Sequence, residues 1–248
     1  MEVTIMCVAV YKPAGVKMPD KATFQSCWDT NPDGAGFAYR SGGKIQICKG
    51  FMKFEKFWDA VKRFENCSGE MFYHFRIATH GGICPENTHP FPVSSDIRAL
   101  QGLTVSTDAC IIHNGILPTT PEHPGISDTM QCIKNIAESG IDTAKAIKLI
   151  EPFLGGSKIA LMTREKTILA GDWHDVDGVK YSNTHWDWGA DFEDDYTEYF
   201  PSDGELKMLE ANICPDCRCP VELDRGEWYC ENCGAIYIKP KQTWNFWQ

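Results

Sequence analysis

The sequence has no long uninterrupted apolar run, and no basic segment followed by a hydrophobic stretch near its start. A helix that spans a bilayer needs roughly 20 apolar residues, and a secretory signal needs the second pattern. We therefore expect a cytoplasmic protein with no membrane partner. Its 12 cysteines are then expected to be reduced thiols rather than disulfides.

Basic residues are scarce relative to acidic ones, and the formal net charge is −10. Much of that charge is local, because the segment 187–205 (DWGADFEDDYTEYFPSDGE) holds eight acidic residues and no Lys or Arg. The rest of the chain is close to neutral and shows no basic stripe that would indicate a nucleic-acid surface. Nucleic acid is therefore a weakly supported partner.

The order of the expected elements favours a layered α/β (α+β) protein. At 248 residues, the chain is long enough for one large domain or for a domain with a small module. Alternating or continuous apolar patterns predict strands, and 3.6-residue periodicity predicts helices. Because strands come first, then helices, then strands again, mostly antiparallel sheets are favoured over βαβ units. Strands are expected over 3–12, 36–50 (two, around a Ser-Gly-Gly turn), 69–80, 109–117, 157–163, 166–173 and 178–183, and helices over 19–29, 54–66, 128–138 and 143–153.

Composition divides the chain into a main domain over 7–186, an acidic linker over 187–205 and a small unit over 206–248. The small unit contains two CxxC pairs, Cys214–Cys217 and Cys230–Cys233. Two such knuckles can hold one structural Zn²⁺ with four thiolates, and the stretch between them, 221–229, fits a hairpin. The alternatives are four unrelated cysteines, or Cys219 as a substitute ligand. The pairing favours a zinc ribbon.

The ribbon carries five basic and six acidic residues. Non-specific binding to phosphates needs an excess of positive charge. A structural or protein-docking role is therefore favoured over nucleic-acid binding.

Several short motifs in the main domain call for a common explanation. They are Met6-Cys7, Asn31-Pro-Asp33-Gly34-Ala-Gly36, His74-Phe-Arg76-Ile-Ala-Thr79-His80-Gly81, Asn87-Thr-His89-Pro90-Phe91, His113-Asn114-Gly115 and Ser127-Asp128-Thr129. In this order and spacing the chain resembles the class II glutamine amidotransferases over residues 6–186. It looks most like their compact stand-alone branch, whose early turn reads NPDG-x-G. The resemblance implies the N-terminal-nucleophile hydrolase fold, a four-layer αββα sandwich.

The same resemblance implies that Cys7 is the nucleophile and the first residue of the mature chain. A thiolate is a strong nucleophile. A free α-amino group, with a pKa of roughly 8, can act as its base. Residues 1–6 are accordingly expected to be a removed leader, or a misassigned start with initiation at Met6.

The family's other roles transfer by position. Asn114 and Gly115 would form the oxyanion hole, Arg76 would bind the α-carboxylate of glutamine, and Asp128 would bind its α-ammonium. Thr79 and His80 would line the pocket, chiefly through backbone contacts. His89 would orient the residues near the glutamine-binding loop without touching the substrate. Members whose early turn reads RG-x-D-x-x-G have an arginine there, and this chain has none over 29–36.

Each of these residues also has a purely structural interpretation. A lone cysteine such as Cys7 is typical of a core, and Asn114-Gly115 is typical of a type I′ hairpin turn. Ser127 or Asp128 could cap a helix, and Arg76 could lie on a strand surface. A metal cluster is a further alternative for His74, His80, His89 and His113.

The leading hypothesis is a glutaminase subunit that forms a glutamyl thioester on Cys7. It would pass ammonia to an acceptor on a partner, which would be a synthase or an enzyme that modifies a nucleobase or nucleic acid. One alternative is an amidohydrolase that acts on a γ-glutamyl or other small amide without ammonia transfer. The other is a catalytically degenerate scaffold whose ribbon binds protein or nucleic acid.

Overall fold

The structure, a computed structural model, describes residues 7–78, 82–123, 125–186, 203–215, 220–224, 227–229 and 236–238. The chain forms two compact units that divide between Trp188 and Gly189. It is a mixed α/β protein, and its sheets are antiparallel. None of the helices in these ranges is both long enough and apolar enough to cross a lipid bilayer.

The larger unit contains a seven-stranded sheet in the order β10-β11-β1-β4-β2-β3-β6. Its strands are β1 (Val8–Lys12), β2 (Ala35–Ser41), β3 (Lys44–Phe51), β4 (Met71–Phe75), β6 (Thr104–Thr107), β10 (His174–Val176) and β11 (Val179–Tyr181). β1 pairs with both β4 and β11, and Val8 lies opposite Phe75. This register brings Cys7, just before β1, beside the residues that follow β4.

A second, four-stranded sheet in the same unit has the order β5-β7-β8-β9. Its strands are β5 (Phe91–Pro92), β7 (Ala109–Asn114), β8 (Lys158–Thr163) and β9 (Thr167–Ala170). The connection from β7 to β8 contains the helices α4 (Asp128–Glu138) and α5 (Thr143–Ile150). β7 therefore ends at a loop that leads into a helix, and Asn114 is its last residue.

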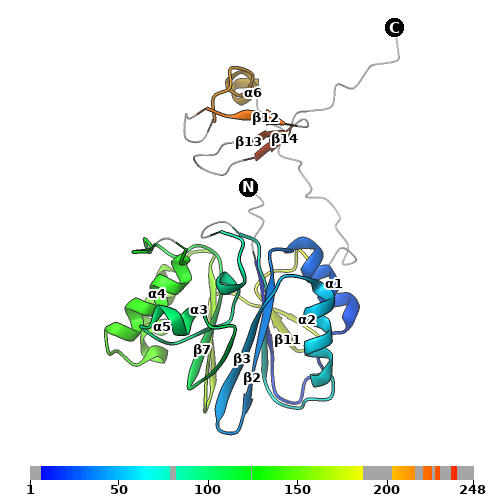
Figure 1. Cartoon of the computed structure of the whole chain (residues 1–248), viewed down its shortest axis with the longest axis vertical. Helices are drawn as coiled ribbons and strands as arrows, with labels where there is room; N and C mark the ends of the chain where they lie inside the picture. The colour runs from blue at the N-terminus through cyan, green and yellow to red at the C-terminus, as the bar shows by residue number, and fades with distance from the viewer. Residues whose placement is uncertain are drawn as a thin grey trace. The chain divides into compact units, whose positions relative to one another are not determined.

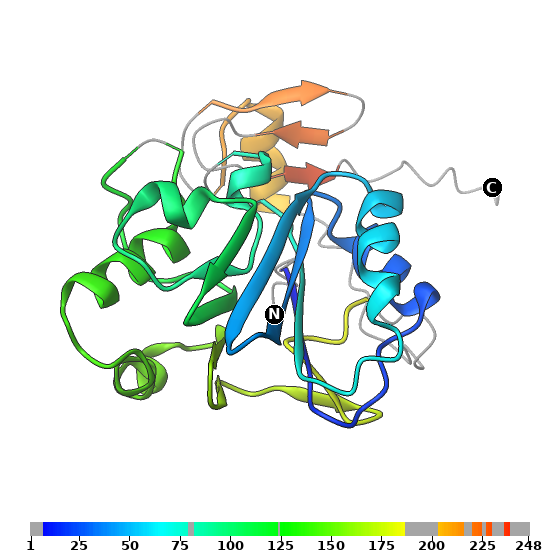
Figure 2. The same cartoon turned by 60° about the horizontal axis from the view of Figure 1, so that its bottom comes forward.

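Three apolar clusters explain how these elements pack. Phe24 on α1 (Lys21–Thr30) and Phe57 on α2 (Phe54–Val61) pack with Phe75 against one face of the seven-stranded sheet. A second cluster joins the two sheets face to face, and it includes Ala9, Ile47, Phe72, Ile112 and Met162. The third covers the outer face of the four-stranded sheet with α4 and α5 through Met130, Ile147 and Leu161. Figures 1 and 2 show α1 and α2 on one side of the strands and α4 and α5 on the other.

The smaller unit has helix α6 (Asp203–Glu210) and a three-stranded sheet. The strands are β12 (Glu222–Asp224), β13 (Glu227–Tyr229) and β14 (Ile236–Ile238). The hairpin expected over 221–229 is confirmed as β12 and β13. α6 begins within the segment that composition predicts as linker. The described core is small and consists of Leu209, Cys214, Val221 and Trp228.

Most predicted helices and strands of the larger unit are present, although the strand expected over 109–117 ends at Asn114 and the helix expected over 54–66 continues after Val61 only as a 3₁₀ turn. Residues 3–6 of the strand expected over 3–12 lie outside the described residues.

The strand expected over 69–80 ends at Phe75. The reason is a change of partner. The backbone N–H of Arg76 donates to Gly34, that of Asp33 donates to Arg76, and Ala78 bonds a side chain instead. The short elements α3 (Ile97–Gln101), β6 and β10 were not predicted, because each spans no more than five residues.

Candidate active site

Cys7 lies at the start of β1, with its Sγ 3.4 Å from both the backbone N and the backbone O of Ile77. Its side chain is partly buried, whereas Cys27 and Cys110 are fully buried. Cys7 is therefore more accessible than these two core cysteines.

Burial is the main influence on this thiol, and it raises the pKa of Cys7 to about 11. The hydrogen bond from the backbone of Ile77 and the positive charge of Arg76 act in the opposite direction, while the negative charge of Asp128 adds to the rise. Both charged side chains therefore act on Cys7, although they lie 69 and 121 positions further along the chain. The resting thiol is protonated and needs a base to become a nucleophile.

Asn114 is fully buried at the end of β7. Its Nδ2 lies 2.9 Å from Oγ of Ser182, and the same Oγ accepts a 2.9 Å hydrogen bond from the backbone N–H of Ala9. Oδ1 of Asn114 is buried and has no hydrogen-bond partner among the described residues. Ser182 thus connects the Asn114 amide to the strand that begins with the candidate nucleophile.

Gly115 has a backbone φ of 126°, a conformation that favours glycine. A Cβ atom there would lie 2.2 Å from Oγ of Ser157 and 2.7 Å from its Cα, so no side chain fits. The chain continues from here toward α4, and the strand that pairs with β7 after this point, β8, begins only at Lys158. The hairpin-turn interpretation of Asn114-Gly115 is therefore wrong.

Arg76 directly follows β4 and is only 4% exposed, so the alternative of a surface arginine is also wrong. Its Nη1 donates to the backbone O of Gly82 at 2.9 Å. The carboxylate of Asp33 accepts a 2.8 Å hydrogen bond from the N–H of Ala78. The Asn-Pro-Asp-Gly turn thereby fixes the course of the chain on either side of Ile77, which contacts Cys7.

Asp128 is the first residue of α4, and the residue before it caps the helix. Oγ of Ser127 accepts from the N–H of Met130 at 3.2 Å. The carboxylate of Asp128 accepts from the N–H of Leu117 at 2.9 Å and of Thr129 at 2.8 Å. Of the two predicted capping residues, Ser127 is the one that caps.

A buried group of three histidines supports the site. The rings of His74 and His89 stack with centroids 4.1 Å apart, and Nε2 of His74 lies 2.9 Å from the backbone O of His113. Burial lowers the pKa of His74 to about 3 and that of His113 to about 4, and it holds the pKa of His89 well below its usual range. All three are therefore neutral near pH 7.

The metal alternative for these histidines stays a prediction, because His80, its fourth member, lies outside the described residues. No group of three or more His, Cys, Asp or Glu within the described ranges is arranged to hold a metal ion. Thr79 and His80 lie outside the described residues, as do Cys217, Cys230 and Cys233 of the expected zinc site.

Two residues at the site were not predicted. Ser182 contacts Asn114, and the side-chain amide of Asn183 donates to the backbone O of Cys7 at 2.9 Å. Both follow β11, which pairs with β1. Their only sequence signal is a polar pair at the end of an apolar strand, and such pairs are common at strand ends.

Hydrogen bonds and charges thus link Cys7, Arg76, Asn114 and Asp128 around the start of β1. Comparison of the chain with models of known protein families found no match, and comparison with curated proteins found no significant relative.

Proposed function

We propose that this protein is a glutamine-hydrolysing amidotransferase subunit whose nucleophile is Cys7. The observation that carries the proposal is the position of the Cys7 thiol under the influence of both Arg76 and Asp128. Glutamine has a carboxylate and an ammonium on one carbon, and its reactive amide lies at the other end. One cation and one anion near a single thiol suit such a substrate, because they would hold its two charges while its amide reaches the sulfur.

The chemistry then follows in two steps. The Cys7 thiolate attacks the γ-amide carbon, and the negative oxygen that forms accepts hydrogen bonds from the Asn114 side chain and the Gly115 N–H. The C–N bond breaks, the nitrogen takes a proton and leaves as ammonia, and a γ-glutamyl thioester remains. Water then adds to the thioester, and its C–S bond breaks to release glutamate and the thiol.

The raised pKa of Cys7 makes a base necessary for the first step. In this proposal the base is the α-amino group of Cys7, which exists only after residues 1–6 are removed. Its pKa of roughly 8 suits proton transfer near neutral pH. The three buried histidines are poor candidates, because each has a strongly lowered pKa and His74 and His113 already hold other groups.

The packing order of the larger unit supports the finer fold assignment. One apolar cluster packs α1 and α2 on the seven-stranded sheet, a second packs the two sheets together, and a third packs α4 and α5 on the four-stranded sheet. The layers are therefore helices, sheet, sheet and helices. This is the order of an N-terminal-nucleophile hydrolase sandwich, αββα. The conformation of Gly115 and the buried Asn114 side chain fit an oxyanion hole at one end of its central layers.

We propose further that the ammonia is used by a partner in the cytoplasm, which would be a synthase or an enzyme that modifies a nucleobase or nucleic acid. Ammonia released into water is protonated and diluted, so a productive transfer requires the acceptor site to face the glutaminase. A complex of the two would raise the yield of transferred nitrogen per glutamine consumed, and this ratio is the measurement that would identify the partner.

The smaller unit is proposed to be a zinc ribbon held by Cys214, Cys217, Cys230 and Cys233. Its described core has four buried residues beside strands of three residues each. With 43 residues over 206–248, the unit is short for folding unaided and suits a metal ion as an additional constraint. Cys214 lies buried within it. The four thiolates would close a tetrahedral sphere, which leaves the metal a structural role.

Zinc analysis tests the ribbon. The purified protein is expected to contain one zinc per chain, and Cys214→Ser is expected to lower that content while glutamine hydrolysis continues. Cys132→Ser, in the larger unit, is the matched control and should leave the zinc content unchanged. Full zinc content in the Cys214→Ser protein would contradict the proposed ligand set.

Glutamine kinetics test the enzyme assignment. Cys7→Ala is expected to abolish glutamate release, while Cys67→Ala, a partly buried cysteine elsewhere in the same unit, should leave it intact. Arg76→Lys keeps the charge but loses the planar fork, so KM for glutamine should rise markedly. Equal turnover of glutamine and of amides that lack the α-amino acid group would contradict the assignment and favour a general amidohydrolase.

A further inference from the structure

The hydrogen bonds of Ser182 leave one buried polar atom without a partner. A serine hydroxyl donates one hydrogen bond and accepts two. Here Oγ accepts from the N–H of Ala9 and is approached by Nδ2 of Asn114. Oδ1 of Asn114 meanwhile is buried and has no hydrogen-bond partner in the described part of the chain. The Asn114 NH₂ group thus donates to a hydroxyl that could itself donate a hydrogen bond.

Turning the Asn114 amide by half a turn lets the hydroxyl of Ser182 donate a hydrogen bond. Oxygen and nitrogen of an amide have nearly the same shape, and their assignment follows from the hydrogen bonds that each can make. After the turn, the hydroxyl of Ser182 donates to Oδ1 and still accepts from Ala9. Oδ1 gains a donor, and Nδ2 takes the buried position where no described residue offers a partner, so its hydrogens are left for a bound ligand.

Ser182 itself is held firmly enough to impose this choice. Its backbone N–H donates to the O of Ala9 at 2.9 Å, and its side chain accepts from the N–H of the same residue. It is also fully buried. One lone pair of the hydroxyl accepts from the N–H of Ala9, so its hydrogen is directed away from Ala9. Asn114 is the neighbour to which that hydrogen can be donated.

We propose that Ser182 is a positioning residue that sets the orientation of the Asn114 amide, so that its NH₂ group faces the substrate oxygen. The inference rests on the proposed function. An amide in the other orientation would present a carbonyl oxygen to the oxygen that becomes negative, and the two would repel. Ser182 does not touch the substrate, and acts only through Asn114.

This role predicts a particular kinetic signature. A hydrogen bond to the developing negative charge is stronger in the transition state than in bound glutamine. Its loss therefore lowers kcat and leaves KM unchanged. A residue that merely supported the fold would lower the melting temperature and disturb KM and kcat together.

The experiment is a double-mutant cycle on the full chain with glutamine as substrate. Ser182→Ala is expected to lower kcat by about 10- to 100-fold, a loss typical of partners that orient a functional group, with KM unchanged. In the Asn114→Ala background the same substitution should have little further effect. Ser139→Ala removes a hydroxyl that bonds only backbone groups near the end of α4, and serves as the control.

Two results would overturn the inference. One is a normal kcat in Ser182→Ala, and the other is an equal loss of kcat with and without Asn114. If Ser182→Ala does not fold, Ser182→Cys keeps the shape, donates only weakly and should lower kcat in the same way. A normal kcat in that variant would overturn the inference as well.

The outcome also separates this inference from the proposed function. An unmodified protein that hydrolyses no glutamine contradicts the function. In that case a second cycle, on the free energies of unfolding of the same variants, tests the Ser182–Asn114 bond directly. Coupling between the two substitutions supports the bond, whereas additive effects would overturn it.

Discussion

The side-chain amide of Asn183 donates a 2.9 Å hydrogen bond to the backbone carbonyl of Cys7. Asn183 is itself fixed, because its Oδ1 accepts from the N–H of His185 and its backbone O accepts from Nε1 of Trp186. Cys7 is therefore held on its main chain by Asn183 and at its sulfur by Ile77. A nucleophile held in this way approaches its target with little freedom, which is an advantage for attack on an amide.

Asn183→Asp should impair the enzyme without changing the size of the side chain. A carboxylate places a negative oxygen against the Cys7 carbonyl, so the two repel and the nucleophile shifts. We expect kcat to fall roughly 10- to 100-fold, as for small misplacements of reacting groups. Asn135→Asp, at an exposed position on α4, is the matched control. Unchanged kcat in Asn183→Asp would show that the hydrogen bond has no role in positioning Cys7.

The Cys7 thiol of the full 248-residue chain should react slowly with alkylating agents at neutral pH. Its pKa is raised to about 11, chiefly by burial, and only the thiolate reacts. The rate of labelling by iodoacetamide should therefore rise with pH up to about pH 11, and Cys7→Ala identifies the labelled site. A rate that levels off near pH 8 or 9 would show that the thiol is not desolvated.

Acid should destabilise the larger unit through its buried histidines. The pKa of His74 is lowered to about 3 and that of His113 to about 4, so the folded state stays neutral where the unfolded state takes up protons. In the unfolded chain a histidine has a pKa of roughly 6.5. Above that pH the free energy of unfolding is therefore at its full value, and below it the free energy falls by about 1.4 kcal/mol per pH unit for each histidine. Denaturant unfolding between pH 7 and pH 4 measures this slope.

The histidine prediction has a variant of its own. His89→Phe keeps a flat ring in the stack and removes one titrating group, so the loss of stability with falling pH should become shallower. His174→Gln, at an exposed position on β10, should leave the slope unchanged. An identical slope in His89→Phe and the original protein would mean that His89 takes up its proton as readily when folded as when unfolded.

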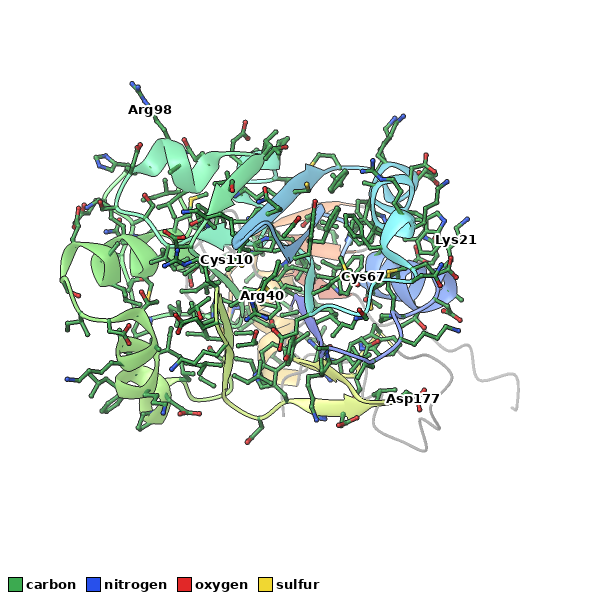
Figure 3. The ribbon with its side chains drawn as sticks, turned by 90° about the horizontal axis from the view of Figure 1, so that it is seen from below. Lys21, Arg40, Cys67, Arg98, Cys110 and Asp177 are labelled. Atoms are coloured by element: carbon green, nitrogen blue, oxygen red, sulfur yellow. The ribbon has the colours of Figure 1, made fainter. Side chains whose placement is uncertain are left out.

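Glu70 joins the two sheets through contacts that include Arg40, which Figure 3 labels. It pairs with Arg40, whose Nε donates to the backbone O of Thr163 at 2.8 Å, and it accepts hydrogen bonds from Tyr11 and Thr167. Glu70→Ala leaves these donors without their shared acceptor, so we expect the free energy of unfolding to fall by about 1–3 kcal/mol. Asp108→Ala breaks the more exposed pairs with Lys44 and Arg164 and should cost less, because solvent screens exposed ion pairs. Equal losses in the two variants would contradict the account of Glu70.

Local patterns predicted the elements that carry the site. α4 spans 128–138 as expected, because a capping serine precedes it and apolar residues recur at helical spacing. α2 was predicted in the same way from its aromatic face. In both cases the necessary information lies within one short segment of the chain.

The parts of the site that depend on distant segments could not be predicted in this way. Ser182 bonds Asn114 across 68 positions and Ala9 across 173. These contacts arise only when β11 pairs with β1 and the two sheets pack together. Arg76 is a comparable case, because nothing in its strand-like segment indicates that the side chain is buried.

The central claim is that Cys7 acts as an N-terminal nucleophile, and its most direct test compares two forms of the chain. One begins at Cys7, as verified by mass spectrometry. The other retains Met1 to Met6, with Met6 replaced by leucine to prevent a second start. Glutamate release from glutamine should occur in the first form, with one ammonia per glutamate, and be absent in the second, because an amide nitrogen cannot take up the thiol proton. Equal activity in the two forms would contradict the account.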